Sequence, residues 1–210
     1  MIDDRADDDG GEVAVSRETV ERRLDAFRAE FARWSSRINL TAADERGTID
    51  ERHIADSLQL LDHAGAPHRW VDVGTGGGFP GLVVAAALPP GTVTLVESNG
   101  KKAAFLRSAA LAMGVAVDVR AERAERVVGA LSPPDVVSAR AVASLADLLI
   151  LLGPWLAGGA LGLFPKGRGA EAEIELAREA HDFDVERRPS RVAPDSTVLL
   201  ITGYRGRRPT

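Results

Sequence analysis

Residues 71–81, VDVGTGGGFPG, constrain the fold of this chain more than any other stretch. An apolar run containing one acid, Asp72, leads into a loop with glycines at 74, 76, 77, 78 and 81, and Pro80 opens an apolar helical run. Glycine allows positive φ and lets a ligand approach the backbone, while proline suits the first turn of a helix. The pattern predicts a strand, a glycine turn and a helix whose N-terminus offers N–H groups to a polar ligand.

The glycine spacing leaves more than one ligand open. Gly76, Gly78 and Gly81 satisfy the G-x-G-x-x-G pattern of dinucleotide sites. An acid followed by G-x-G-x-G is instead typical of the loop that binds S-adenosylmethionine (SAM) in methyltransferases. Asp72 favours SAM, because an acid there binds either the loop's own N–H groups or a ligand ammonium. Glu97, which ends the next apolar run, is placed to accept both hydroxyls of an adenosine ribose, a group that both ligands contain. A glycine turn that binds nothing is the third alternative.

Composition excludes several classes of protein. With 210 residues, 45% of them hydrophobic, the chain suits one α/β domain with a small extension. No run approaches the roughly 20 apolar residues of a membrane span, and the acidic N-terminus is unlike a secretory signal. The absence of cysteine excludes disulfides, thiolate metal sites and a cysteine nucleophile. The histidines are scattered singly, so we expect no metal site. Since the sequence shows no membrane span, secretory signal or cysteine, we expect a cytoplasmic protein with no membrane partner.

The formal net charge of −5 is distributed unevenly. The first twelve residues hold six acids and one arginine, so the rest of the chain is formally neutral. Basic clusters in this remainder bind nucleic acid only if they surround the glycine loop, and are otherwise solvated surface. The candidates for RNA binding are Lys101, Lys102, Lys166, Arg168, Arg205, Arg207 and Arg208.

The N-terminal quarter of the chain contains a predicted tail and a predicted helix. Residues 1–15 are acidic and lack apolar periodicity, which predicts a disordered tail. From Ser16, a candidate N-cap, apolar residues recur every three or four positions as far as Trp34. This spacing predicts an amphipathic helix.

A second predicted helix completes an extension placed before the sheet. Residues 48–51, Thr-Ile-Asp-Glu, form a candidate capping box, and Ile54, Leu58 and Leu61 follow on one helix face. We therefore divide the chain into a tail at 1–15, a helical extension at 16–66 and a sheet domain at 67–210.

From residue 69 onward, predicted strands and helices alternate. We predict strands at 70–73, 93–97, 115–120, 135–139, 159–164, 183–188 and 197–203, and helices at 80–88, 100–113, 144–152 and 170–181, with a short turn near 124–130. Such alternation predicts an α/β fold with a doubly wound, mostly parallel, seven-stranded Rossmann-like sheet. Ligands then bind at the carboxyl ends of the strands.

The sequence also restricts the acceptor of a methyl group. A SAM methyl is already activated, so a methyltransferase mainly positions the acceptor and excludes water. A pyrimidine C5 acceptor needs a cysteine, and the chain has none. The segment Ser132-Pro133-Pro134-Asp135 precedes its strand and lacks an aromatic residue, so we interpret it as a loop and not as an amine-binding clamp. A purine N7 has a lone pair and no proton, so it suits a chain with few acid–base residues.

The motifs RINLTA, RHIADSL, VDVGTGGGFPG, ESNGKKAAFL, RAE, SARAVASL and FPKG occur in this order. Over about residues 20–205, the set resembles the RsmG (GidB) family, the 16S ribosomal RNA guanine-N7 methyltransferases. The resemblance implies a class I SAM-dependent methyltransferase with an N-terminal helical cap. It also implies methylation of N7 of guanine 527 in the 530 loop, with 16S rRNA or the small subunit as partner.

The resemblance implies a set of site residues as well. Gly74 and Phe79 match the SAM loop, and Ala124 with Glu125 match the segment beside the adenine, although Arg120-Ala121-Glu122 offers a second register. Arg140 matches the arginine after the fourth strand, for which we expect positioning rather than base catalysis. The expected cofactor site therefore comprises Asp72, Gly74, Gly76, Gly78, Phe79, Glu97, Ala124, Glu125 and Arg140.

Several alternatives stay open. Phe79 could pack in the core, Arg140 could form a surface ion pair, and His53, Asp56 and Ser57 could line the cleft or be structural. A small-molecule methyltransferase and a catalytically silent SAM- or ribosome-binding module both suit the same fold. A nicotinamide-dependent oxidoreductase is disfavoured, because the chain has a single tyrosine and no second domain.

Overall fold

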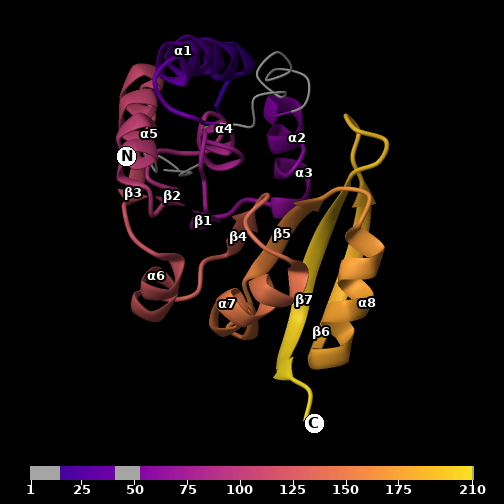
Figure 1. Ribbon diagram of the computed structural model, residues 1–210. Helices are drawn as coiled ribbons and strands as arrows, with labels where there is room; N and C mark the ends of the chain where they lie inside the picture. Colours follow the sequence, from indigo (N-terminus) through magenta and orange to yellow (C-terminus); the bar gives the residue numbers. More distant parts are fainter. Residues whose placement is uncertain (1–14, 41–52, 210) are drawn as a thin grey trace, which may run out of the picture.

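The computed structural model describes residues 15–40 and 53–209 (Figure 1). Its elements are α1 (Arg17–Ser35), α2 (Ala55–Leu58), α3 (Leu61–Ala64), β1 (Trp70–Val73), α4 (Gly81–Ala85), β2 (Val93–Val96), α5 (Gly100–Met113), β3 (Val117–Arg120), α6 (Ala124–Ala130), β4 (Val136–Ala139), α7 (Leu145–Ala157), β5 (Leu161–Lys166), α8 (Ala170–Ala180), β6 (His181–Pro189) and β7 (Thr197–Arg207). The predicted capping box and nearly all of the predicted tail lie outside the described residues.

The strands form one seven-stranded sheet in the order β3-β2-β1-β4-β5-β7-β6. The first five strands are parallel, and β7 runs antiparallel to both β5 and β6. The order reverses direction at β1, so β1 and β4 lie side by side at the centre. This confirms the predicted mostly parallel sheet, and the crevice at the reversal is where doubly wound sheets bind ligands.

Helices cover both faces of the sheet (Figure 1). On one face, α1, α4 and α5 pack with Trp70 of β1 in a single core. On the other, α6, α7 and α8 pack with Val71 and Val73 of the same strand. Neighbouring side chains of a strand point to opposite faces, so β1, buried at all four positions, contributes to both cores. Since α1 shares the first core, the predicted extension packs as part of the sheet's own interior; its boundary at residue 66 stays a prediction.

Helix caps occur where the sequence predicts them. The hydroxyl oxygen of Ser16 accepts a hydrogen bond from the N–H of Thr19 at the start of α1. At the start of α5, Asn99 Oδ1 accepts from two backbone N–H groups, and Gly114, with φ of 66°, ends the helix. These local signals explain why the predicted helix at 100–113 has the observed bounds.

Several predicted elements differ from the structure. The helix predicted at 80–88 is observed only over Gly81–Ala85, and the turn predicted near 124–130 is the helix α6. The helix predicted through Ile54 and Leu61 is divided into α2 and α3. Leu60, which lies between them, is fully buried. The helix predicted to end at residue 152 continues through Pro154 to Ala157 as α7. Trp155, which follows the proline, is 1% exposed and donates through its indole N–H to a backbone carbonyl. Burial of this side chain outweighs the hydrogen bond that proline removes.

None of the described helices is both long and apolar enough to cross a membrane.

Candidate active site

The glycine loop lies between β1 and α4, at the carboxyl edge of the parallel strands (Figure 1). Gly74, Gly76 and Gly78 have φ of 69°, 57° and 94°. Residues with a Cβ rarely adopt such angles, so the loop's path requires glycine at these positions. The prediction that these glycines bring backbone within reach of a ligand is consistent with this conformation.

The N-terminal extension packs directly against the same loop. A Cβ on Gly77 would lie 2.9 Å from the carbonyl oxygen of Leu40, and one on Gly78 would lie 3.0 Å from the ring of Phe27. Both neighbours belong to the segment that begins with α1, and both are buried. The extension therefore packs against the glycine loop at Gly77 and Gly78.

Asp72 holds the loop and does not face a ligand. The side chain is 0% exposed. Its Oδ2 accepts from the N–H of Gly81 at 3.0 Å, and its Oδ1 accepts from the hydroxyl of Ser138 at 2.7 Å. Burial raises the pKa of this carboxyl to about 6, although these hydrogen bonds act in the opposite direction. Of the two roles that the sequence allows, the structure supports the loop contact, and the expected direct contact of Asp72 with the cofactor is corrected.

Glu97 binds the loop from the next strand. Its Oε2 accepts from the N–H of Gly76 at 3.0 Å, and its Oε1 accepts from the N–H of Asn99 at 2.7 Å. A carboxylate has about four acceptor positions, so each oxygen keeps one for another donor. Glu97 thus joins the glycine loop to the start of α5 and retains acceptor capacity for a ligand.

A cavity of about 150 Å³ lies beside Glu97. Its lining consists of Val73, Gly74, Val96, Glu97, Ser98, Glu122, Arg123, Ala124, Glu125, Val142 and Leu151. Past Val142 it adjoins an open groove of about 610 Å³ along α6 and α7. The aliphatic side chains of the lining suit the adenine ring, and Glu97, one of its three carboxylates, suits the ribose of an adenosine. Both registers of the predicted adenine segment contribute to this lining, so the preference for Ala124 and Glu125 stays a prediction.

Val142 is a site residue that the sequence analysis did not identify. A Cβ on Gly74 would lie 2.5 Å from Val142 Cγ2, so this side chain covers the first glycine of the loop. The preceding Ala141 has φ of 54°, an unusual value for a residue with a Cβ. The signal available in the sequence was the position of Val142 in the segment directly after β4.

Phe79 and Arg140 stack together. Phe79 is 4% exposed and packs edge-on against Phe27, with ring centroids 5.3 Å apart. The guanidinium carbon of Arg140 lies 5.3 Å from the centroid of the Phe79 ring. The core-packing alternative for the Phe79 ring is therefore confirmed, and the ring also supports the arginine by a cation–π contact.

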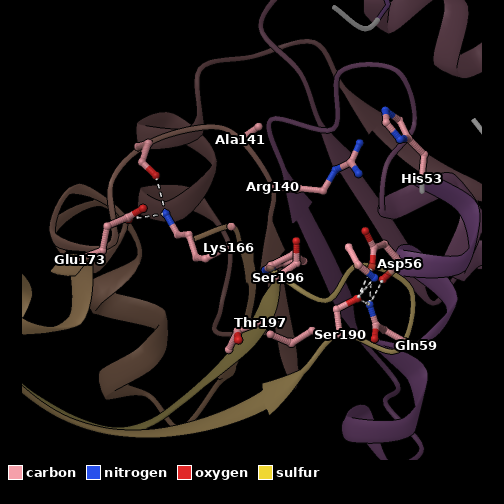
Figure 2. Close-up of a pocket in the computed structure, with 15 residues that line it drawn as sticks. His53, Asp56, Gln59, Arg140, Ala141, Lys166, Glu173, Ser190, Ser196 and Thr197 are labelled. Carbon is pink, nitrogen blue, oxygen red and sulfur yellow. Dashed lines mark hydrogen bonds and ion pairs between the residues drawn. The ribbon is translucent and has the colours of Figure 1, made fainter. Parts of the chain in front are cut away.

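A second cavity, of about 450 Å³, is lined by Arg140 (Figure 2). It lies among α2, the ends of β4 and β5, and the loop between β6 and β7. Its polar lining includes His53, Asp56, Gln59, Arg140, Lys166, Glu173, Ser190, Ser196 and Thr197. The volume is within the roughly 300–1,000 Å³ of small-molecule sites.

Lys166 and Glu173 hold the segment after β4 in place. Lys166 Nζ donates to the carbonyl oxygen of Ala143 at 2.8 Å and pairs with Glu173 Oε2 at 2.7 Å. The same carboxylate oxygen accepts from the N–H of Leu145, at the start of α7. The Lys166 side chain is only 10% exposed, so its position suits a supporting role more than the predicted RNA contact.

The predicted basic residues do not form one surface. Lys102 Nζ lies 4.0 Å from the Cβ position of Gly76, and Lys101 precedes it in α5. Arg168 follows the edge of the second cavity and is 87% exposed.

The three arginines near the C-terminus lie at the opposite end of the sheet. Thr197 of β7 pairs with Lys166, and Arg207 is ten residues further along an antiparallel strand, or about 33 Å away at 3.3 Å per residue. Arg205 also forms hydrogen-bonded ion pairs with Asp182 and Asp184. These three arginines therefore lie away from the glycine loop, and their expected contact with RNA stays a prediction.

Among the described residues, no group of three or more histidine, cysteine or acidic side chains is arranged to hold a metal ion.

Known proteins resemble this chain in both sequence and fold. The family described as GidB, rRNA small subunit methyltransferase G, matches residues 20–194. Proteins named ribosomal RNA small subunit methyltransferase G from Brucella ovis and Brucella suis are each 46% identical over 195 residues, which is 91% of this chain and 91% of theirs.

Solved structures show the same fold at low identity. The O-methyltransferase TomG from Streptomyces achromogenes, solved in complex with SAM, has a TM-score of 0.54 and 18% identity, covering 92% of this chain and 94% of that one. A ribosomal protein L11 methylase from Lactobacillus delbrueckii has a TM-score of 0.54 and 17% identity, covering 70% and 76%. The fold is that of class I SAM-dependent methyltransferases, as predicted. With the family match over most of its length, the chain belongs to the rRNA small subunit methyltransferase G family of SAM-dependent enzymes.

Proposed function

We propose that the protein methylates N7 of guanine 527 in the 530 loop of 16S rRNA, with SAM as methyl donor. The proposal is supported by one observation: the segment that follows β4 lines both cavities. Val142 lines the cavity beside Glu97, while Arg140, Ala141 and Ala143 line the polar cavity of about 450 Å³. One short segment thus separates a cavity suited to adenosine from a cavity suited to a polar acceptor.

The first cavity and the adjoining glycine loop support a set of cofactor residues. Gly74, Gly76 and Gly78 would offer backbone to SAM, Glu97 would accept its ribose hydroxyls, and Ala124 and Glu125 would contact its adenine. The Phe79 ring is buried, so Phe79 would contribute its backbone. When bound, SAM supplies an activated methyl group on a sulfonium sulfur.

Methylation of guanine N7 requires little from the protein beyond correct placement of the base and the methyl donor. Guanine N7 carries an in-plane lone pair and no proton, so it could take the methyl group without a general base, and S-adenosylhomocysteine would leave as the methyl–sulfur bond breaks. The purine gains positive charge, and an arginine beside it cannot stabilise that charge. Arg140 therefore serves as a hydrogen-bond donor, to guanine O6 or to a SAM carboxylate, and its stack on Phe79 fixes its direction. Fixed direction matters because a 1 Å misplacement can reduce a rate about 100-fold.

RNA would reach the polar cavity over a basic margin. Lys101, Lys102 and Arg168 are the candidates that remain on this side of the molecule. Their partner would be 16S rRNA or the assembled small subunit, in the cytoplasm. Proteins read RNA bases best in loops, where a base can be unstacked into such a cavity.

The test is methylation in vitro of small subunits that lack the mark. Borohydride and aniline cleave RNA at N7-methylguanosine, so the product maps the modified base. We expect cleavage at guanine 527 with the wild-type protein, and a loss of about 100-fold in rate for Arg140→Ala with thermal stability retained. Absence of cleavage in the 530 loop after reaction with the wild-type protein would refute the guanine-N7 assignment.

A further inference from the structure

We propose that Asp56 selects guanine over other bases by accepting hydrogen bonds from guanine N1–H and the N2 amino group. This inference rests on the proposed function, since it names the residue that reads the acceptor base. It begins with the two carboxylates that line the cavity of about 450 Å³, Asp56 and Glu173.

The two carboxylates differ in what they already bind. Glu173 Oε2 accepts from Lys166 Nζ and from a backbone N–H, so its charge is paired. Asp56 Oδ1 accepts from Gln59 Nε2 at 2.7 Å and from Ser190 Oγ at 2.8 Å. Within the described part of the chain, Asp56 Oδ2 has no hydrogen bond and the carboxylate has no cationic partner. Asp56 is therefore the carboxylate of this cavity whose charge is unpaired among the described residues, and its Oδ2 is available to a ligand.

The surrounding network holds Asp56 in one orientation. Gln59 Oε1 accepts from the N–H of Arg191, and Ser190 Oγ accepts from the N–H groups of Val192 and Ala193. These bonds join α2 to the loop between β6 and β7, more than 130 residues away in sequence. An acceptor that is fixed before binding loses little entropy when a base arrives.

The arrangement in the cavity matches the order of polar groups on guanine. Figure 2 shows Lys166 and Glu173 on one side and Asp56, Gln59 and Ser190 on the other, with Arg140 above Asp56 and its guanidinium directed toward His53. Along one side of guanine, N7 is followed by O6, then N1–H, then the N2 amino group. With N7 toward the wall shared with the cofactor cavity, O6 faces Arg140, and N1–H and N2 face Asp56.

The chemistry of Asp56 then excludes adenine. An ionised carboxylate only accepts hydrogen bonds, and guanine presents two adjacent donors on this edge. Adenine presents an acceptor at N1, which a carboxylate repels. Sites built to bond a donor group reject analogues that lack it, because their buried polar groups are left unpaired.

The test compares 530-loop RNA carrying guanosine or inosine at the target position. Inosine keeps N7, O6 and N1–H and lacks only the N2 amino group. A hydrogen bond to a charged group corresponds to roughly 10- to 100-fold, so we expect the wild-type protein to prefer guanosine in kcat/KM by that factor. Wild-type protein that methylates both RNAs equally would overturn the role of Asp56 without any variant being made.

The variant Asp56→Asn then tests whether Asp56 causes the preference for guanosine over inosine. Asparagine keeps an oxygen for Gln59 and Ser190 and replaces the other oxygen with a donor, so the preference is expected to fall below about threefold. Asp62→Asn is the matched control: it removes the same charge from α3, where Asp62 pairs with Arg191 outside the cavity, and the preference should be unchanged.

The outcomes separate the two proposals. Wild-type protein that leaves N7 of guanosine unmethylated overturns the proposed function and the role of Asp56 with it. Methylation of guanosine with a preference that survives Asp56→Asn overturns only the role of Asp56. A purely structural role would reduce both reactions together and leave their ratio unaltered.

Discussion

Replacing Glu97 by glutamine is expected to weaken SAM binding by roughly 10- to 100-fold. In the structure, the two carboxylate oxygens accept from the N–H groups of Gly76 at 3.0 Å and Asn99 at 2.7 Å, and the side chain is 8% exposed. Each oxygen keeps an acceptor position for a ribose hydroxyl. Glutamine has one oxygen, and its NH₂ group would face either a backbone N–H or a hydroxyl that needs an acceptor.

The magnitude follows from one charged hydrogen bond. Such a bond contributes about 1.5–3 kcal/mol, and each 1.4 kcal/mol changes a dissociation constant tenfold. The glycine loop also loses the contact that ties Gly76 to α5, which adds to the effect.

Isothermal titration calorimetry with SAM measures this effect, and thermal unfolding confirms that the variant is folded. Glu122→Gln is the matched control, because it removes the same charge from the lining of the same cavity. We expect this control to bind within twofold of wild type. Unchanged affinity for Glu97→Gln would refute the ribose assignment, and equal losses in both variants would show that net charge, not the placed acceptor, governs binding.

Three further predictions test the loop and the surface. Asp72 has a folded pKa of about 6, above its ordinary 3.8, so its contribution to stability is full below pH 3.8 and is lost as pH rises through 6. Over this window, urea denaturation should show wild type losing about 3 kcal/mol of unfolding free energy relative to Asp72→Asn. Gly81→Ala places a methyl 2.7 Å from Asp72 Oδ2 and should destabilise by about 1–3 kcal/mol, whereas Gly100→Ala, with nothing within 4 Å, should be neutral or stabilising; equal melting temperatures for the two variants would contradict this. Lys102→Gln should reduce the slope of log affinity against log salt for 530-loop RNA by about 0.7, while Arg207→Gln, at the far end of the sheet, should leave the slope as it is in anisotropy titrations.

The sequence predicts best where the physical cause is local. The bounds of α5 agree with prediction because Asn99 satisfies the first N–H groups and Gly114 takes the left-handed conformation that ends a helix. The glycine loop follows the same rule, since its positive φ angles require residues without a Cβ. The alternation of strands and helices then allows few arrangements other than a mostly parallel sheet.

Burial overrides such local signals in other places. The helix predicted at 144–152 continues through Pro154 as α7, because Trp155 and Leu156 are buried against the sheet. The predicted helix through Ile54, Leu58 and Leu61 is interrupted between α2 and α3, where Leu60 is buried in the core and Leu61 is partly buried. Each case depends on packing partners that lie elsewhere in the chain.

The sequence by itself therefore determined the class of fold, the cofactor loop and, through its ordered motifs, the family. Only the tertiary structure decided which polar residues line a cavity and which are enclosed in the core. From the sequence, Asp72 is a candidate ligand contact. In the structure, it accepts a hydrogen bond inside the core from the hydroxyl of Ser138, 66 residues away. Asp56 reads as one member of a helix face but meets Ser190, 134 residues away, at the wall of a cavity. The accessibility of a carboxylate depends on segments that come together only when the chain folds. A local sequence pattern does not specify these long-range contacts.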